Sequence, residues 1–339
     1  MDYEIFALGE VTLQSGVTLP NAFLAYKTYG ELNEKKDNVV IYPTAFGDQH
    51  VQNEWLIGHD KALNPEKYFI IVPNLLGNGL SSSPSNTPAP FDKANFPQVS
   101  IYDNVHFQYR LVTEKFGIQK IALVVGWSMG AIQAFQWGAS YPDMVERIAP
   151  FCGGAKTWPQ TYVVLDGMKA ALLAAVGFDS SKLNQLTSAD MRTVGRVYAG
   201  WGLSQAYYRE ELYQQMGFYS FEDFVTGVFE NSFMRMDPHN FLAMLWTGQF
   251  ADISANPAYN GNFDEALRSI NAIASIMPGS TDLFCTADEN EYEANLIPNA
   301  VLKPIQSIWG HFAGRGINSS DNKFIDDNLK RLLALGEKS

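Results

Sequence analysis

The chain has 339 residues, of which 46% are hydrophobic and 13% aromatic, so it can bury a large core, and a disordered protein is excluded. Its formal net charge is -12, with no cluster of lysine and arginine, which argues against nucleic acid or an anionic membrane as a partner. No apolar run approaches the length of a membrane helix, the first residues are acidic where a signal peptide is basic, and the two cysteines show no disulfide framework. We therefore expect a cytoplasmic, soluble protein.

Apolar runs and amphipathic stretches alternate along the first half of the chain. Residues 4–30 are predicted to form a β-hairpin around the turn at Ser15-Gly16. The periodicity of apolar residues predicts buried strands at 38–42, 68–73, 121–125 and 145–151, and helices at 55–63, 101–116 and 131–140. This alternation is typical of a mostly parallel sheet with helices on both faces, which is an α/β fold.

The pattern changes after the fourth of these buried strands. Between residues 156 and 255 strand-like runs disappear, and helical stretches rich in large side chains replace them. The alternation then resumes, with strands predicted at 273–277 and 301–308 and helices at 289–296 and 321–335. We therefore predict an α/β core from residues 1–155 and 256–339, interrupted by a helical lid at 156–255. Most aromatic residues of the lid are expected to form its own core.

The stretch around Ser128 contains the pattern G-x-S-x-G, with Gly126 and Gly130 on either side of the serine. It lies between the strand predicted at 121–125 and the helix predicted at 131–140, the context of a nucleophile on a sharp strand-to-helix turn. Such a turn strains the backbone of the serine, and a Cβ atom at either glycine would crowd it. Because the hydroxyl would lie at a helix N-terminus, backbone N–H groups could stabilise an oxyanion there. We predict that Ser128 is a nucleophile, and the alternative is a chance match on a loop.

A serine nucleophile needs a base, and the base needs an acid that orients it. On folds with this type of turn, the acid follows one strand and the histidine follows the last strand. His311 directly follows the last predicted strand, whereas the other histidines come before the last two strands or lie in the lid. Asp282 follows the penultimate strand, and we prefer it to Asp288 because the acid usually lies in the first turn past the strand.

Two backbone N–H groups are candidates for an oxyanion hole, the site that stabilises the negative oxygen of the reaction intermediate. One belongs to Met129, which follows the nucleophile. The other belongs to Ala45, in the glycine-containing loop after an early strand, and Phe46 is the alternative to Ala45.

Two other kinds of site have weaker support. His50 and His59 lie near aspartates, but their spacing matches no known metal motif, so we expect no metal. The segment Asn74–Gly79 contains G-x-G but lacks the third glycine and the following helix of a dinucleotide-binding loop. We therefore expect no cofactor.

The chain also resembles a known family, the homoserine O-acetyltransferase branch of the α/β hydrolases, almost from end to end. The resemblance rests on seven motifs: Trp55-Leu56-Ile57-Gly58, Asn74-Leu75-Leu76-Gly77, Phe96-Pro97, Tyr141-Pro142-Asp143-Met144-Val145, Arg235-Met236-Asp237-Pro238, Ser280-Thr281-Asp282-Leu283-Phe284 and Gly310-His311. It implies an α/β-hydrolase fold, with a mostly parallel sheet of about eight strands and an inserted helical lid. It further implies an acyl-serine intermediate and a homodimer formed through the lids.

Some positions match the family and others depart from it. Arg235 matches an active-site arginine that holds a substrate carboxylate, and a salt bridge within the lid, with Asp237 as partner, is the alternative. Phe312 stands where the family has an aspartate that helps to hold the substrate amine, and Phe241 stands where it usually has a tyrosine. Trp127 is bulkier than the usual residue before the nucleophile. A substrate pocket lined by these side chains, without a counter-charge for an amine, should not favour a zwitterionic amino acid.

Three functions follow from these observations. The leading hypothesis is a serine hydrolase that cleaves a small ester, thioester or amide through an acyl-Ser128 intermediate. Its substrate would carry a carboxylate if Arg235 holds one. The alternative is an O-acetyltransferase that uses acyl-CoA as a co-substrate and acts on homoserine or another small alcohol. A non-catalytic binding protein is the third hypothesis, and the complete set of serine, aspartate and histidine argues against it.

Overall fold

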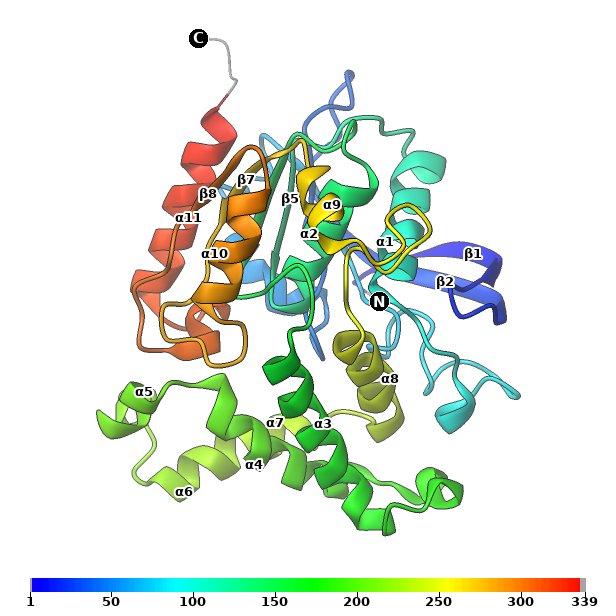
Figure 1. The fold of residues 1–339 in the computed structure, drawn as a ribbon, viewed down its shortest axis with the longest axis vertical. Coiled ribbons are helices and arrows are strands. Elements are labelled where there is room, and N and C mark those ends of the chain that lie inside the picture. Colours follow the sequence, from blue (N-terminus) through cyan, green and yellow to red (C-terminus); the bar gives the residue numbers. More distant parts are fainter. Residues whose placement is uncertain (1, 336–339) are drawn as a thin grey trace.

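Residues 2–335 are described by the computed structural model, and they form an eight-stranded sheet covered by helices (Figure 1). The order of strands across the sheet is β1-β2-β4-β3-β5-β6-β7-β8. The strands are β1 (Glu4–Thr12), β2 (Thr18–Tyr29), β3 (Val39–Ile41), β4 (Phe69–Pro73), β5 (Leu123–Trp127), β6 (Arg147–Phe151), β7 (Ile273–Ile276) and β8 (Ala300–Leu302). Only the pairs β1–β2 and β2–β4 are antiparallel, which confirms the mostly parallel, eight-stranded sheet.

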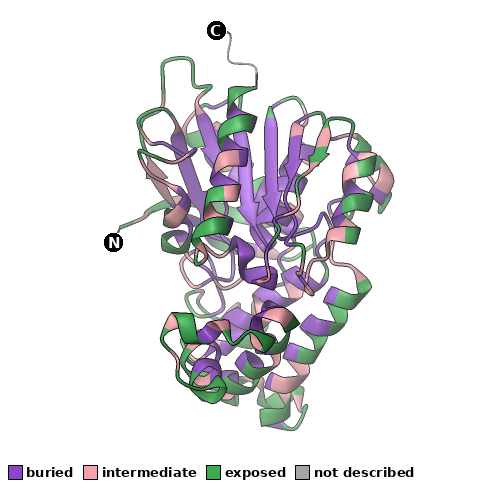
Figure 2. Ribbon diagram, turned by 90° about the vertical axis from the view of Figure 1, so that its left-hand side faces the viewer, coloured by how far each residue is buried: buried purple, intermediate pink, exposed green. Residues whose placement is uncertain are grey.

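Alternate residues of the central strands point to opposite faces of the sheet, and both faces are buried (Figure 2). Ile41 of β3 and Val124 of β5 belong to the core on the face covered by α1, α2 and α9. Val40 and Val125 belong to the core on the other face, together with Leu329 of α11. The helices of the α/β part are α1 (Ile101–Arg110), α2 (Met129–Ser140), α9 (Phe263–Arg268), α10 (Ala287–Leu296) and α11 (Ser319–Ala334).

A helical segment separates β6 from β7, and we call residues 156–255 the helical insertion. It contains α3 (Pro159–Leu173), α4 (Met191–Gly202), α5 (Gln205–Arg209), α6 (Phe221–Phe224), α7 (Asn231–Phe233) and α8 (Pro238–Gln249). Figure 1 shows these helices together at one end of the sheet. The two connections to the α/β part run side by side, because Thr157 N donates to Ala251 O and Ile253 N donates to Ala155 O.

The aromatic residues of the helical insertion divide between two cores. Phe233 and Phe241 pack with other residues of the insertion, as the sequence predicts. Tyr207, Phe224 and Phe229 instead belong to the core that includes Trp309 and other residues beside the sheet. The insertion is thus fastened to the α/β part by a shared apolar core.

Two sequence expectations for local structure are wrong. The helix expected at 55–63 is replaced by a short 3₁₀ helix at His50–Leu56 and a loop. The strand expected at 301–308 ends much earlier, just before Pro304, which has no N–H group to donate to the sheet. Helix α9 was not expected.

Within the described residues, no helix is long and apolar enough to cross a membrane.

Candidate active site

Ser128 lies in the sharp turn between β5 and α2, at the carboxyl end of the strand. Its backbone has φ 55° and ψ −119°, a conformation that residues with side chains rarely adopt. A Cβ atom at Gly126 would lie 2.3 Å from the carbonyl carbon of Gly130, and one at Gly130 would lie 2.7 Å from the carbonyl oxygen of Pro43. Both glycines are therefore needed for the turn that presents the serine hydroxyl.

The structure brings Ser128, His311 and Asp282 together in one hydrogen-bonded chain. His311 Nε2 lies 2.8 Å from Ser128 Oγ, and His311 Nδ1 lies 2.7 Å from Asp282 Oδ2. The side chains of His311 and Asp282 are buried, whereas the competing acid, Asp288, is exposed on the first turn of α10. Because Asp282 accepts the proton of Nδ1, Nε2 is the nitrogen that faces the serine hydroxyl as an acceptor.

Backbone contacts hold Asp282 in place. Its Oδ1 atom accepts hydrogen bonds from the backbone N–H groups of Phe284, at 2.8 Å, and Cys285, at 3.0 Å. Oδ2 therefore remains for the imidazole. Burial and the nearby charge of Asp282 raise the pKa of the Cys285 thiol well above its usual value. This cysteine stays protonated at neutral pH, which leaves Ser128 as the nucleophile beside the imidazole.

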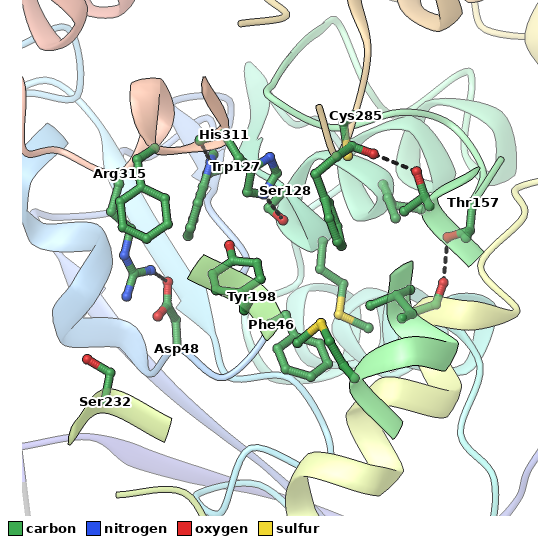
Figure 3. A pocket seen from close by; sticks show the side chains of 18 of the residues that line it. Phe46, Asp48, Trp127, Ser128, Thr157, Tyr198, Ser232, Cys285, His311 and Arg315 are labelled. Carbon is green, nitrogen blue, oxygen red and sulfur yellow. Dashed lines mark hydrogen bonds and ion pairs between the residues drawn. The ribbon is translucent and has the colours of Figure 1, made fainter. Parts of the chain in front are cut away.

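A cavity of about 260 Å³ opens onto Ser128 and His311 (Figure 3). Most of its wall is apolar, and it is formed by both the α/β part and the helical insertion. The wall includes Phe46, Trp127, Met129, Ile132, Leu165, Met168, Tyr198, Phe229, Phe233, Phe284, Phe312 and Ile317. Such a cavity suits a small substrate with a largely apolar surface.

Two of the expected substrate-binding residues, Trp127 and Phe312, line this cavity. The indole N–H of Trp127 donates to the backbone oxygen of His311 at 3.1 Å, so the bulky side chain lies beside the base. The ring of Phe312 packs against Tyr198 and Phe229, with centroids 6.1 Å and 5.7 Å apart. Both residues therefore shape the wall around His311.

The candidate oxyanion residues differ in their relation to the cavity. Met129 and Phe46 line it, whereas Ala45 is buried and faces a separate, much smaller cavity. Of the two alternatives for the second donor, Phe46 thus lines the substrate cavity and Ala45 does not.

The structure corrects the expectations for Arg235 and Phe241. Arg235 is exposed between α7 and α8 and does not line the cavity, because Phe233 and Met236 occupy the inward positions of this segment. The alternative salt bridge is also absent, since the Asp237 carboxylate accepts backbone N–H groups at the start of α8 and lies beside His239. Phe241 is fully buried behind the cavity wall, where it packs on Phe46 and Phe233.

Sequence reasoning missed the charged residues of the cavity wall, among them Asp48 and Arg315. The side chains of these two residues form an ion pair, and the Arg315 guanidinium also lies 4.7 Å from the centre of the Trp127 ring. Burial lowers the pKa of Arg315, but the charge and the hydrogen bond of Asp48, together with nearby tyrosines, outweigh burial, so the pKa is raised. The closeness of Arg315 to His311 in the chain was the one available signal, whereas nothing in the sequence pairs it with Asp48.

The two histidines of the metal alternative lie in a described part of the chain that contains no group of three or more His, Cys, Asp or Glu side chains suited to a metal ion. His50 Nε2 lies 3.2 Å from Asp2, and its backbone N–H donates to Asn74. His59 is exposed beside Glu66. The two histidines therefore have separate structural partners.

Comparison with known proteins places the chain in a family. A family model described as alpha/beta hydrolase fold matches residues 38–170. The ethyl acetate hydrolase of Pseudomonas veronii is 35% identical over 335 residues, which cover 98% of this chain and 95% of that protein. A homoserine O-acetyltransferase of Chlorobium chlorochromatii is 27% identical, with coverage of 94% and 92%.

A similar structure has been solved for an acetyl esterase, MekB. It superposes with a TM-score of 0.93 at 34% sequence identity, over 98% of this chain and 96% of that one. The fold, the sharp turn that carries Ser128 and the sequence similarity to these relatives, which extends over nearly the whole chain, all indicate the same family. The protein is therefore an enzyme of the α/β-hydrolase family, in the branch that also contains the homoserine O-acetyltransferases.

Proposed function

We propose that this enzyme hydrolyses small, neutral carboxylic esters, with Ser128 as nucleophile, His311 as base and Asp282 as orienting acid. The observation that carries the proposal is the hydrogen-bonded chain of these residues at a small, mostly apolar cavity. The relatives support it, since one is named for the hydrolysis of ethyl acetate and another structure is that of an acetyl esterase.

In the first half of the reaction, Ser128 Oγ attacks the ester carbonyl carbon while His311 Nε2 takes its proton. The backbone N–H of Met129, with that of Ala45 or Phe46, stabilises the negative oxygen of the tetrahedral intermediate. His311 then gives the proton to the leaving alcohol oxygen, and the acyl group stays on Ser128. Asp282 remains ionised and stabilises the imidazolium.

In the second half, water takes the place of the alcohol. His311 removes a proton from the water as it attacks the acyl carbon, and then returns a proton to Ser128 Oγ as the carboxylic acid leaves. These steps need only residues of the chain and water. We therefore propose no cofactor, and acetyl-CoA would enter only as the co-substrate of a transferase.

The wall of the cavity argues for water rather than homoserine as the acceptor. Among the described residues that line it, Asp48 is the one carboxylate, and it is already paired with Arg315. Phe312 lies in an aromatic cluster and offers no counter-charge. A homoserine ammonium group would lose its hydration there without gaining an ion pair.

The test is the fate of the acyl group from p-nitrophenyl acetate, with and without homoserine. We expect a burst of p-nitrophenol followed by steady release of acetate, no burst with Ser128→Ala, and little O-acetylhomoserine. Efficient acetylation of homoserine by acetyl-CoA would overturn the choice of water. If the correctly folded protein neither hydrolyses p-nitrophenyl acetate nor acetylates homoserine, the acyl-enzyme mechanism itself is wrong.

Location and assembly remain proposals as well. We propose a cytoplasmic location, in keeping with the acidic composition of the chain. A homodimer through the helical insertion is supported by its exposed large side chains, which include Tyr162, Phe178, Tyr219, Phe221 and Phe250. Sedimentation velocity would test the dimer, and a monomer at micromolar concentration would contradict it.

A further inference from the structure

We propose that Asp48, Arg315 and Tyr198 form a polar subsite that binds a neutral hydrogen-bonding group, such as a hydroxyl, on the alcohol half of the ester. The inference rests on the proposed esterase function and adds a preference for esters whose alcohol carries a second polar group. All three side chains line the same cavity as Ser128 and His311. Figure 3 shows Arg315 and Asp48 on one side of Ser128, and Cys285 and Thr157 on the other.

The three side chains have hydrogen-bonding capacity that the protein does not use. A guanidinium group has five N–H donors, and the one side-chain hydrogen bond of Arg315 to a described residue is that of Nη1 with Asp48 Oδ2. Asp48 Oδ1 and the Tyr198 hydroxyl have no hydrogen-bond partner among residues 2–335. Burial raises the pKa of Tyr198, so its phenol stays protonated and can both donate and accept.

The charges of this subsite select a neutral group rather than a carboxylate. Asp48 is 5% exposed and cancels the charge of Arg315 at close range. Lys156 is the other cation of the cavity wall, and its Nζ lies 4.3 Å and 4.0 Å from the ring centres of Trp158 and Phe263. The Arg315 side chain is 29% exposed, so the ion pair is partly removed from water. Such a pair costs free energy unless further hydrogen bonds satisfy it, and a substrate hydroxyl can supply these bonds without adding charge.

The position of the subsite indicates which half of the ester it contacts. His311 gives its proton to the leaving oxygen, so the alcohol half must lie beside the imidazole. Arg315 directly follows the short helix Gly310–Gly314 that carries His311. Its guanidinium covers the ring of Trp127, whose centre is 5.1 Å from that of His311. The polar subsite is therefore next to the departing alcohol.

The first test compares two acetate esters of equal size, 2-hydroxyethyl acetate and propyl acetate, in which a hydroxyl replaces a methyl group. The ratio of their kcat/KM values should favour the hydroxyl ester in the native enzyme. Tyr198→Phe should lower this ratio by about tenfold, because one hydrogen bond to the hydroxyl is lost. Tyr213→Phe is the matched control, since Tyr213 is buried in the insertion outside the cavity, and it should keep the native ratio.

A second variant should gain activity toward an anionic ester rather than lose selectivity for the hydroxyl ester. Asp48→Asn keeps the shape of the side chain but leaves the Arg315 cation without its partner. The kcat/KM value for acetoxyacetate, which carries a carboxylate on its alcohol half, should then rise at least about fivefold relative to propyl acetate. This result does not depend on whether Tyr198→Phe folds.

The outcomes separate the subsite from the general reaction. If both neutral esters are hydrolysed through Ser128 but their ratio is the same in Tyr198→Phe, and Asp48→Asn gains nothing toward acetoxyacetate, the subsite is wrong and the esterase function stands. If the native enzyme hydrolyses none of these esters, the esterase function fails first and the subsite fails with it.

Discussion

The Arg315 guanidinium lies 4.7 Å from the ring centre of Trp127, the residue directly before the nucleophile Ser128. The same indole ring donates its N–H to the backbone oxygen of His311 and lies 5.1 Å from the imidazole ring. Trp127 therefore connects the Asp48–Arg315 ion pair to the base. The large residue before Ser128 therefore contacts the base and also forms part of the cavity wall.

The roles assigned to Ser128, His311 and Asp282 predict how much activity each substitution should remove. Ser128→Ala or His311→Ala should abolish nearly all hydrolysis of p-nitrophenyl acetate, leaving only the contribution of binding and the oxyanion hole. Asp282→Asn should reduce kcat by about four orders of magnitude, because the imidazole would take the wrong tautomer. Asp288→Asn is the control and should change kcat by less than about twofold, since Asp288 is exposed. A crippled Asp288→Asn enzyme with an active Asp282→Asn enzyme would reverse the assignment.

Arg235→Ala should have little effect on catalysis. Arg235 is exposed and does not line the cavity, so it has no contact through which to hold a substrate carboxylate. The kcat/KM values for ethyl acetate and for acetoxyacetate should each change by less than about twofold. A loss specific to the anionic ester would show that Arg235 reaches the substrate.

Glu293 makes the stability of the enzyme depend on pH. Its side chain is fully buried, and it accepts hydrogen bonds from Ala155 N, Trp158 Nε1 and Asn290 Nδ2 at 3.0, 3.1 and 3.0 Å. Burial raises the pKa of Glu293 to about 8, although these three donors oppose the shift. The native state therefore holds this proton more tightly than the unfolded state does.

Because the folded pKa is above the unfolded one, the free energy of unfolding should fall as pH rises from about 4.5 to about 8. The contribution of Glu293 to this fall is roughly 4–5 kcal/mol in total. Glu293→Gln cannot ionise, so urea unfolding at pH 5.5 and 8.5 should show a much smaller difference than in the native enzyme. Glu291→Gln, an exposed position on the same helix, should behave like the native enzyme. Equal pH dependence in Glu293→Gln and the native enzyme would contradict the shifted pKa.

Gly126→Ala should destabilise the turn that carries Ser128. Its new Cβ atom would lie 2.3 Å from both the carbonyl carbon and the oxygen of Gly130, and backbone atoms cannot rotate away. We expect a loss of about 3 kcal/mol or more in thermal unfolding, together with loss of activity. Gly167→Ala on α3 is the matched control, because no atom lies within 4 Å of its Cβ position, and it should stabilise the protein by about 0.5–1 kcal/mol. A stable and active Gly126→Ala enzyme would contradict the strained turn.

Local chemistry allowed much of the architecture to be predicted. Buried parallel strands appear as continuous apolar runs, and the glycines around Ser128 mark a turn that tolerates no Cβ atom at either position. The order of Ser128, Asp282 and His311 along the chain, each after a predicted strand, was enough to expect them at one edge of the sheet. The strand predicted at 301–308 ends at Leu302, because Pro304 has no N–H group to donate to the sheet. The helix predicted at 55–63 is replaced by a 3₁₀ helix that ends at Leu56 and a loop.

The sequence by itself thus determined the fold and the hydrogen-bonded chain at Ser128, since both depend on periodicity and on residues next to strand ends. Only the tertiary structure decided which side chains surround the substrate. Asp48 and Arg315 lie far apart in the chain and meet because the loop after β3 and the segment after the short helix that carries His311 come together beside the cavity. Arg235 lies in the helical insertion, where short helices and turns leave no periodic pattern that separates inward from outward positions. The exposure of Arg235 is therefore set by how the insertion packs over the sheet. The contact between the buried Asp48 and the partly exposed Arg315 is set by how two loops of the α/β part come together.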